Sequence, residues 1–510
     1  MKKGLFTLLF CSICSLVLSQ GNTEVYLFDL ELNKGTYQLS NPKNISNNHG
    51  YDNQPSFWND DVVLFSSTRA GQTDIKLFSI TEGSTSKWIT NTPTGSEYSP
   101  LRIPSSNTVS SIRLDLDGLQ RLYEYDANSG ESEPLSELKI GYHVWYNDHI
   151  LVATVLVDNR MDLVILDFEK GTDVVVDKNV GRSLHKIPGT NLVSYIQKSS
   201  VEGQKSQIVS LDPVSQEKEN LYAMEFPIND IAWLPDGSIL APNNNKIVRY
   251  HLQKDSTWQD FHVFNKDQVF KISRMAVNPS GTRLALVTDV SPIEVVQRQV
   301  DTFNKRDLNA FVANYSENVL AQRFPNDTMY LGKGKMLDSY ERFFANTKST
   351  KVEVVKRIAI GNNVIDEEVT LVDGRKGHQV ALYQVEGGII NTMSFIFPNQ
   401  ETSDAEAVVT EQLTAYNSRD IDAFLDTYSE DIKLYNYPDS LFSEGKEKMR
   451  EGYDNFFKST PDLHCEIKNR MVIGNKVIDE EYITANGSNF SAVAIYEVEN
   501  GKIAKVTFLR

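Results

Sequence analysis

Short stretches of alternating apolar and polar residues fill the first half of the chain, and turn residues separate them. A period of two is typical of strands that bury one face. Similar units recur at intervals of roughly 42 to 46 residues, the range of a propeller blade. There are six units, whose equivalent positions are Trp58, Leu101, Trp145, Ile187, Trp233 and Val277.

One sheet of about four short strands cannot bury both of its faces alone. Radial packing of several sheets solves this problem, so residues 20–290 are predicted to form an all-β, six-bladed propeller. The sixth unit ends early, at Val290, and the region begins with an unmatched strand at residues 24–31. We expect that strand to complete the last blade and close the ring.

The phrases "LPDGSILA", "NPSGTRLAL" and "LFSSTRAGQTDIKLF" resemble the repeats of TolB-like six-bladed propellers, over residues 22–290. The pairs Asp236-Gly237 and Ser280-Gly281 are turn residues whose first role is structural. This region contains neither a Ser-His-Asp order nor a G-x-S-x-G motif. A propeller that binds or scaffolds is therefore favoured over a catalytic one.

The second half of the chain contains one domain written twice. Residues 293–397 align with residues 406–510 without a gap, and about 39 of 105 pairs are identical. The match includes "GNNVIDEE" at 361–368 and "GNKVIDEE" at 474–481. The sequence therefore predicts two tandem domains, at residues 291–398 and 403–510.

Each copy begins with helical spacing and ends with strand spacing. Capping boxes at 291–294 and 403–406 open a first helix, and Asp307 and Asp420 are expected to cap a second. A third helix carries the Tyr-x-x-Phe-Phe segment. From about residue 352 or 465 the period changes to two, which predicts four antiparallel strands. Each copy is thus an α+β cone, with three helices on a curved antiparallel sheet.

The phrases "NSRDIDAFLDTYSEDI", "GKEKMREGYDNFF" and "AVAIYEVENGKIAKVTFLR" carry a resemblance to a known family. They resemble the SnoaL-like group of the nuclear-transport-factor-like superfamily, which includes ketosteroid isomerases. The resemblance implies a sheet that curls around the helices and leaves an apolar-walled cavity suited to a small molecule.

Isomerase relatives need a carboxylate base, a tyrosine and a protonated acid. At the position where the isomerases have the tyrosine, this sequence has Gln299 and Gln412. At the position of the base it has Arg323 and Asn436. The acid falls near valines in both copies. The resemblance therefore does not extend to isomerase chemistry.

The acidic run of the repeated octapeptide allows two interpretations, because alternate residues of a strand share a face. In one, the run forms a solvated face, with a single inward acid paired to Arg470 on the neighbouring strand. In the other, Glu367 and Glu480 are acids of the pocket. His464 is present in the second copy only, where the first copy has Lys351.

Tyr435, Asn436 and Tyr437 are interpreted either as ligand contacts at the cavity mouth or as rim aromatics. The candidate pocket residues are Gln299, Arg323, Arg357 and Glu367 in the first copy, and Gln412, Tyr435, Asn436, Tyr437, His464, Arg470, Glu480 and Tyr496 in the second.

The N-terminal sequence "MKKGLFTLLFCSICSLVLSQGN" has two lysines followed by a short apolar run, which is typical of a signal peptide over residues 1–19. A membrane anchor is the alternative, although the run is short for a span. We expect an exported protein, periplasmic or extracellular, with no membrane span after signal removal. Only Cys465 then remains, so no internal disulfide is expected.

The net charge of -17 disfavours nucleic acid as a partner. The scattered histidines give no metal spacing, and no cofactor is expected. The favoured function is binding or scaffolding without catalysis, with a protein or glycan on the propeller and a small apolar molecule in the cones. One alternative is an enzyme acting in the second cone. The other is an assembly module, whose cone sheets pair within the chain or between chains.

Overall fold

The computed structural model describes residues 22–509 apart from residues 34, 49, 82–84, 200, 202–203, 266–268 and 400–403. The predicted signal peptide lies outside the described residues. The chain divides into two compact units, one of Met1–Phe264 with Lys271–Asp289 and one of Asn265–Phe270 with Val290–Arg510. Within the described part of the chain, no helix is long and apolar enough to span a membrane.

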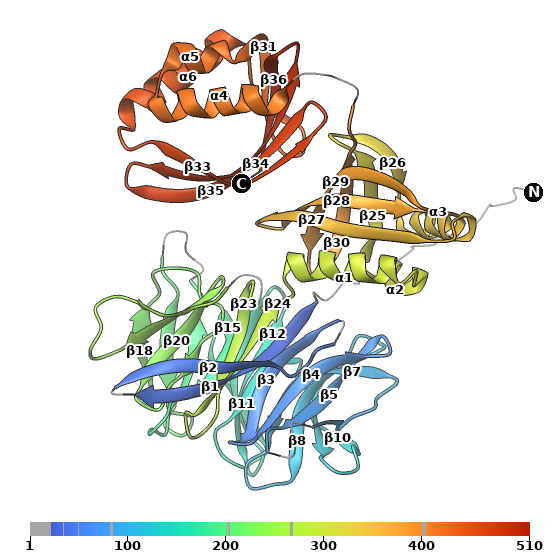
Figure 1. Cartoon of the computed structure of the whole chain (residues 1–510). Coiled ribbons are helices and arrows are strands. Elements are labelled where there is room, and N and C mark those ends of the chain that lie inside the picture. The colour runs from blue at the N-terminus through green and yellow to red at the C-terminus, as the bar shows by residue number, and fades with distance from the viewer. Residues whose placement is uncertain are drawn as a thin grey trace, which may run out of the picture. The chain divides into compact units, whose positions relative to one another are not determined.

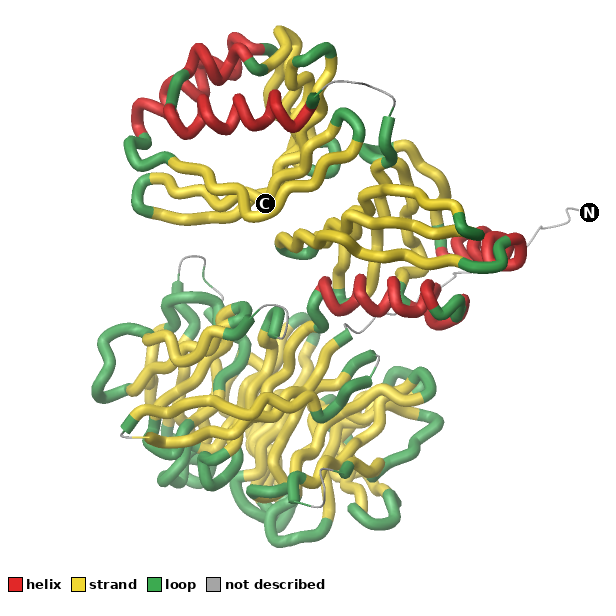
Figure 2. Tube along the Cα trace, viewed as in Figure 1, coloured by secondary structure: helices red, strands yellow, loops and turns green. Residues whose placement is uncertain are grey.

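The first unit consists of six four-stranded antiparallel sheets (Figure 1), and Figure 2 shows it as strand and loop. Neighbouring sheets pack through shared apolar clusters. Leu64 and Ile75 of one sheet, for example, belong to the same buried cluster as Val109 and Tyr123 of the next. The predicted six-bladed propeller is confirmed.

Five of the six sheets use strands that are consecutive in the chain. These sheets are β3 (Asp52–Asn59), β4 (Val62–Arg69), β5 (Gln72–Ser79) and β6 (Ser86–Trp88); β7 (Gly95–Arg102), β8 (Thr108–Asp115), β9 (Gln120–Asp126) and β10 (Ser132–Ser136); β11 (Ile140–Trp145), β12 (Ile150–Val157), β13 (Arg160–Asp167) and β14 (Thr172–Asp177); β15 (Val180–Lys186), β16 (Val193–Gln197), β17 (Gln207–Leu211) and β18 (Lys218–Ala223); and β19 (Ala232–Trp233), β20 (Ser238–Asn243), β21 (Lys246–His251) and β22 (Gln259–Val263).

The sixth sheet joins the two ends of the unit and has the order β2-β1-β24-β23. Its strands are β1 (Thr23–Asn33), β2 (Thr36–Asn44), β23 (Ile272–Val277) and β24 (Arg283–Asp289). The prediction that an N-terminal strand closes the ring is confirmed, since β1 pairs with β24. The N-terminal region supplies two strands rather than one. The outer strand β2 is mostly exposed and therefore has no apolar alternation to reveal it.

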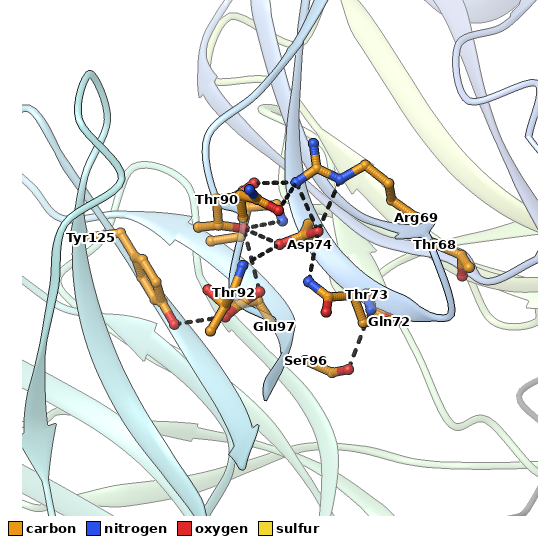
Figure 3. A network of polar contacts seen from close by, with 12 residues as sticks. Thr68, Arg69, Gln72, Thr73, Asp74, Thr90, Thr92, Ser96, Glu97 and Tyr125 are labelled. Atoms are coloured by element: carbon orange, nitrogen blue, oxygen red, sulfur yellow. Dashed lines mark hydrogen bonds and ion pairs between the residues drawn. The ribbon is translucent and has the colours of Figure 1, made fainter. Parts of the chain in front are cut away.

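Buried carboxyl groups lie where the first two blades meet (Figure 3). Asp74 and Glu97 are both 0% exposed, and the Thr90 hydroxyl lies 3.1 Å from Asp74 Oδ1 and 3.3 Å from Glu97 Oε2. The Tyr125 hydroxyl donates to Glu97 Oε1 at 3.1 Å. Burial, reinforced by the charge of Asp74, raises the pKa of Glu97 to about 7.

A matching junction lies between the sixth sheet and the first. Here Glu24 and Asp52 are the buried acids, and Ser46 supplies the hydroxyl, which donates to Glu24 Oε2 at 2.5 Å. Burial raises the pKa of Asp52 to about 7 as well, and the charge of Glu24 adds to this shift. The Ser67 hydroxyl donates to Asp52, so the two acids at this junction are bonded by separate hydroxyl groups rather than by one. The junction that closes the ring therefore also buries two acids with hydroxyl partners.

These junctions make the stability of the propeller depend on pH. Glu97 has a folded-state pKa above its unfolded value of 4.5, so the folded state binds more protons between these two values. Its contribution to the free energy of unfolding is complete below about pH 4 and is lost as pH rises through 7, with a total on the order of 3 kcal/mol.

We expect urea unfolding to give a higher propeller stability at pH 5 than at pH 8. Glu97→Gln should reduce this difference, because an amide does not titrate. Glu137→Gln, at an exposed site in the same region, is the matched control and should keep the full difference. An identical pH dependence in Glu97→Gln and in the unmodified chain would refute the assignment.

The second unit contains two cones with the same element order. The first cone comprises α1 (Pro292–Asn304), α2 (Leu308–Ala313), β25 (Tyr315–Arg323), β26 (Asp327–Leu331), α3 (Lys333–Asn346), β27 (Thr350–Ile360), β28 (Asn363–Val372), β29 (Arg375–Glu386) and β30 (Ile389–Ile396). The second comprises α4 (Ala405–Ser418), α5 (Ile421–Asp426), β31 (Tyr428–Asn436), β32 (Ser440–Glu444), α6 (Lys446–Ser459), β33 (His464–Ile473), β34 (Lys476–Ala485), β35 (Ser488–Glu499) and β36 (Lys502–Leu509).

Each cone sheet has six strands rather than the four that the period-two pattern predicted. The sheet order is β26-β25-β30-β29-β28-β27 in the first cone and β32-β31-β36-β35-β34-β33 in the second. The two additional strands precede the third helix, and one of them pairs in parallel with the last strand of its cone. The helices lie across one face of each sheet (Figure 1), so the three-helix α+β cone is confirmed.

The helix caps follow the sequence in part. Asp307 and Asp420 accept backbone hydrogen bonds at the start of α2 and α5, as predicted. The N-cap of α4 is Asp404, one residue later than the predicted box at 403–406 places it, and its side chain accepts from the backbone N–H of Ala407. Ser291 is the N-cap of α1 but makes no side-chain capping bond, so the predicted capping box does not form there. Pro292 at the first helical position supplies the required backbone geometry instead.

The sheet faces turned away from the helices share one apolar cluster. Ile365 and Leu382 of the first cone belong to it together with Ile478 and Ile495 of the second. A hydrogen bond of 2.8 Å from Lys356 Nζ to a backbone carbonyl of β33 also joins the two sheets. Burial of these alternate strand positions stabilises both sheets at once.

The domain boundaries remain a prediction, which expression of separate pieces tests. We expect residues 20–290 and residues 291–510 each to fold alone, because each buries its own core. Circular dichroism should show cooperative thermal unfolding for both pieces. The domain boundaries would be contradicted if one piece unfolded without cooperativity while the full chain unfolded cooperatively.

Candidate functional site

A cavity lies between the helices and the sheet of each cone, with a volume of about 370 Å³ in the first and about 440 Å³ in the second. Aromatic side chains at matching positions of the two copies line both cavities. They are Phe303, Tyr315, Tyr340, Phe343 and Phe395 in the first cone, and Tyr416, Tyr428, Tyr453, Phe456 and Phe508 in the second.

The first cavity has a polar cluster built around Glu368 on β28, which is 2% exposed. The Tyr383 hydroxyl donates to Glu368 Oε1 at 3.0 Å, and Gln379 Nε2 donates to Glu368 Oε2 at 2.7 Å. Gln299 Nε2 on α1 in turn donates to the Tyr383 hydroxyl at 3.0 Å. All four side chains line the cavity.

The electrostatics of this cluster favour a carboxyl group that is close to half protonated at neutral pH. Burial raises the pKa of Glu368 to about 7, and the nearby charge of Asp366 adds to the shift. The hydrogen bonds from Gln379 and Tyr383 act in the opposite direction, because they stabilise the carboxylate. Glu368 is therefore able to accept or to donate a hydrogen bond near neutral pH.

The second cavity repeats this cluster with fewer polar groups. The Tyr496 hydroxyl donates to Glu481 Oε1 at 2.8 Å, and Glu481 is 7% exposed. Gln412 lines the cavity and forms a hydrogen bond with Tyr428. Ala492 stands where the first cone has Gln379, so no amide is available at that position. The cluster around Glu481 is thus less polar than the cluster around Glu368.

The ion pair beside each cluster connects the first helix to the sheet. Arg357 donates to both oxygens of Asp366, at 2.6 and 2.7 Å, and its Nη1 donates to Gln297 of α1 at 2.9 Å. Arg470 binds Asp479 in the same way, at 2.7 and 2.6 Å, and also donates to Thr410 of α4 at 2.7 Å. Bidentate pairs of this kind fix orientation as well as contributing energy.

Three of the twelve candidate residues line a cavity, namely Gln299, Gln412 and Tyr496. Arg357 and Arg470 bind the neighbouring buried acids instead. Glu367 and Glu480 lie on the opposite sheet face: His378 Nε2 is 3.0 Å from Glu367 Oε1, and Asn469 Nδ2 donates to Glu480 Oε2 at 2.5 Å.

The remaining candidates lie away from the cavity linings. Arg323, Asn436 and His464 are exposed. The ring of Tyr435 lies 5.0 Å from Lys505 Nζ, and Tyr437 packs against the apolar cluster shared by the two sheets.

Glu368 and Glu481 are the acids that sequence reasoning did not select. The octapeptide contained them, but the pattern did not say which of its two faces meets the helices. Identity between the copies marks the glutamine, the acid and the tyrosine at 299/412, 368/481 and 383/496, but 367/480 and 357/470 are identical as well, so identity alone does not single out the cavity residues. In the described residues, no group of three His, Cys, Asp or Glu side chains is placed to hold a metal ion.

Comparison with known proteins finds the SnoaL-like domain twice, at residues 296–392 and 409–506. An uncharacterized cystatin-fold protein from Novosphingobium aromaticivorans is 31% identical over 22% of this chain and 100% of its own, with a TM-score of 0.20. A putative TolB from Agrobacterium tumefaciens is 12% identical over 52% of this chain and 98% of its own, with a TM-score of 0.41. TolB from Acinetobacter baumannii is 11% identical over 53% of this chain and 64% of its own, with a TM-score of 0.36. No curated protein matches the chain.

Removal of one amide should change the titration of Glu368. In Gln379→Ala we expect the Glu368 pKa to rise above about 7, because the carboxylate loses a hydrogen-bond donor. Carboxyl resonances of ¹³C-labelled glutamate, followed from pH 4 to 9, would measure the shift. Gln384→Ala, on the same strand but outside the cavity lining, is the control. An unchanged or lowered pKa in Gln379→Ala would contradict the proposed network.

Proposed function

Because the chain belongs, through residues 296–392 and 409–506, to the SnoaL-like family, we propose that each cone binds a small apolar molecule without catalysis. The observation that carries the proposal is an aromatic-walled cavity with a polar cluster of an acid, a tyrosine and a glutamine in its lining, present in both copies. Volumes of about 370 and 440 Å³ fall within the range of small-molecule sites. Apolar walls supply the driving force for binding, and the polar cluster orients one polar group of the ligand.

The two cones are proposed to prefer different ligands. The first cavity offers Glu368, Gln379 and Thr370, whereas the second offers Glu481 with Ala492 and Ile483 at the matching positions. A ligand hydroxyl or amide placed against the first cluster finds both donors and acceptors. The cluster of the second cavity suits a ligand group with fewer hydrogen-bonding atoms, because a buried polar group left without a partner costs more free energy than one hydrogen bond contributes.

The absence of turnover is proposed from the chemistry of the side chains. Gln299 and Gln412 stand where isomerase relatives carry a tyrosine, and an amide has no accessible acidic or basic form. An enzyme remains the second candidate because the pKa of Glu368, at about 7, suits proton transfer. A model enone steroid should nevertheless remain unisomerised. Turnover that disappears in Glu368→Gln or Glu481→Gln would favour the enzyme.

Two broader roles belong to the same proposal. The propeller is proposed to contact a protein or glycan, and the signal-type N-terminus supports export to the periplasm or beyond. Assembly through the cone sheets is the remaining alternative. The apolar cluster that joins the two sheets favours pairing within one chain, because it already occupies the surfaces that a second chain would need.

Ligand binding is testable with a pair of matched blocking variants. Ser339 and Gly452 occupy the same position in the two copies, and each lines the cavity of its own cone. An apolar fluorescent probe such as N-phenyl-1-naphthylamine should bind the intact chain at two sites. Ser339→Trp and Gly452→Trp should each remove one site, and the double variant should remove both, because the indole fills the cavity.

The controls place the same side chain on the same helices outside the cavities. Arg342→Trp and Asn455→Trp, at exposed matching positions, should keep both probe sites. Binding that persists in the double variant would show that the probe does not enter the cones.

A further inference from the structure

A separate, smaller cavity lies within the propeller. Residues of, or directly before, the innermost strands of all six sheets form its wall, and its volume is about 80 Å³. Its polar side chains include Ser99 on β7, His143 on β11, Arg182 on β15, Asp230 before β19 and Arg274 on β23. The wall is thus built jointly by sheets that are far apart in the sequence.

Two arginines line this cavity, and neither forms an ion pair with a carboxylate of the described residues. Arg182 Nη2 donates to a backbone carbonyl of β23 at 2.7 Å, and the Arg274 guanidinium lies 5.1 Å from the ring centroid of Tyr142. Burial and the charge of Arg274 lower the pKa of Arg182. Asp230 already accepts the backbone N–H of Met275, at 2.9 Å. The wall therefore carries more positive than negative charge.

Three buried polar atoms of the wall have no hydrogen-bond partner among the described residues. They are Arg182 Nε, His143 Nδ1 and Ser99 Oγ. Arg182 Nε and Ser99 Oγ carry protons that they are able to donate. Burial of such groups without partners is costly, so their gathering around one cavity needs an explanation. A ligand with acceptor oxygens would satisfy these donors and the excess positive charge together.

We propose that this cavity binds a small oxyanion, the carboxylate or phosphate group of a ligand, between Arg182 and Arg274. Guanidinium groups present paired N–H donors that match the oxygens of both groups. A volume of about 80 Å³ accommodates such a group and excludes the larger molecules that suit the cones. The proposal is independent of the cone ligand, because it uses residues of the propeller only.

Isothermal titration of the full chain with sodium phosphate and with sodium acetate, each against sodium chloride at equal ionic strength, tests the site. Saturable binding of phosphate or acetate, but not of chloride, is the expected result. Tighter binding of phosphate would identify the phosphate group as the ligand chemistry, and tighter binding of acetate would identify the carboxylate. No saturable binding of either anion, or equal binding of chloride, would overturn the proposal.

Substitution of the two arginines tests whether the anion binds in this cavity. Arg182→Gln and Arg274→Gln should each weaken it by about tenfold or more, because each removes a charged pair of donors. Arg274→Lys keeps the positive charge but removes the paired N–H donors, so it should weaken binding to an intermediate degree. This variant also tests the site if Arg182→Gln fails to fold. Arg121→Gln, an arginine outside the cavity lining, should bind like the unmodified chain. Equal affinities in all four variants would show that the anion binds elsewhere.

Discussion

The alternation of side chains along a strand is the constraint on which the cones depend. On β28 and β34 it places Asp366 with Glu368, and Asp479 with Glu481, on the face that meets the helices. The first acid of each pair binds an arginine that also holds the first helix, and the second acid borders the cavity. A shift of one residue would move the cavity acid to the opposite face of the sheet and bring its neighbour to the helix side. The register of the strand therefore sets both the ion pair that holds the helix and the acid that borders the cavity.

The same alternation explains why the two cones pack on each other. The residues that alternate with these acids along each strand point to the opposite face of the sheet. Those such as Ile365 and Ile478 are apolar, and they form the shared cluster between the two sheets. Glu367 and Glu480 lie on this side as well, and hydrogen bonds or ion pairs compensate their charges. Duplication in tandem therefore provided a partner surface of matching composition within a single chain.

The propeller solves a related problem with different chemistry. Its blades meet through apolar clusters, yet two junctions bury pairs of acids that accept hydrogen bonds from hydroxyl groups. Such groups are stabilised at low pH, because burial favours their neutral form. The cavity within the propeller differs from these junctions, since two arginines and a single aspartate, Asp230, line it and the described residues give neither arginine an ion pair. Buried polar groups in the propeller thus serve two arrangements: one lies between blades, and the other lines a small cavity.

The sequence by itself determined the fold classes, the duplication and the closing strand, because repeats and period-two or helical spacing are local properties of the chain. It also identified Gln299, Gln412 and Tyr496, which line the cavities. Tertiary structure decided the rest. Strands such as β2 and β26 are largely exposed and have no apolar alternation, so only their hydrogen-bonded partners identify them. The choice of Glu368 over Glu367, and of Glu481 over Glu480, depends on which sheet face the helices cover, and that is set by packing between segments distant in sequence.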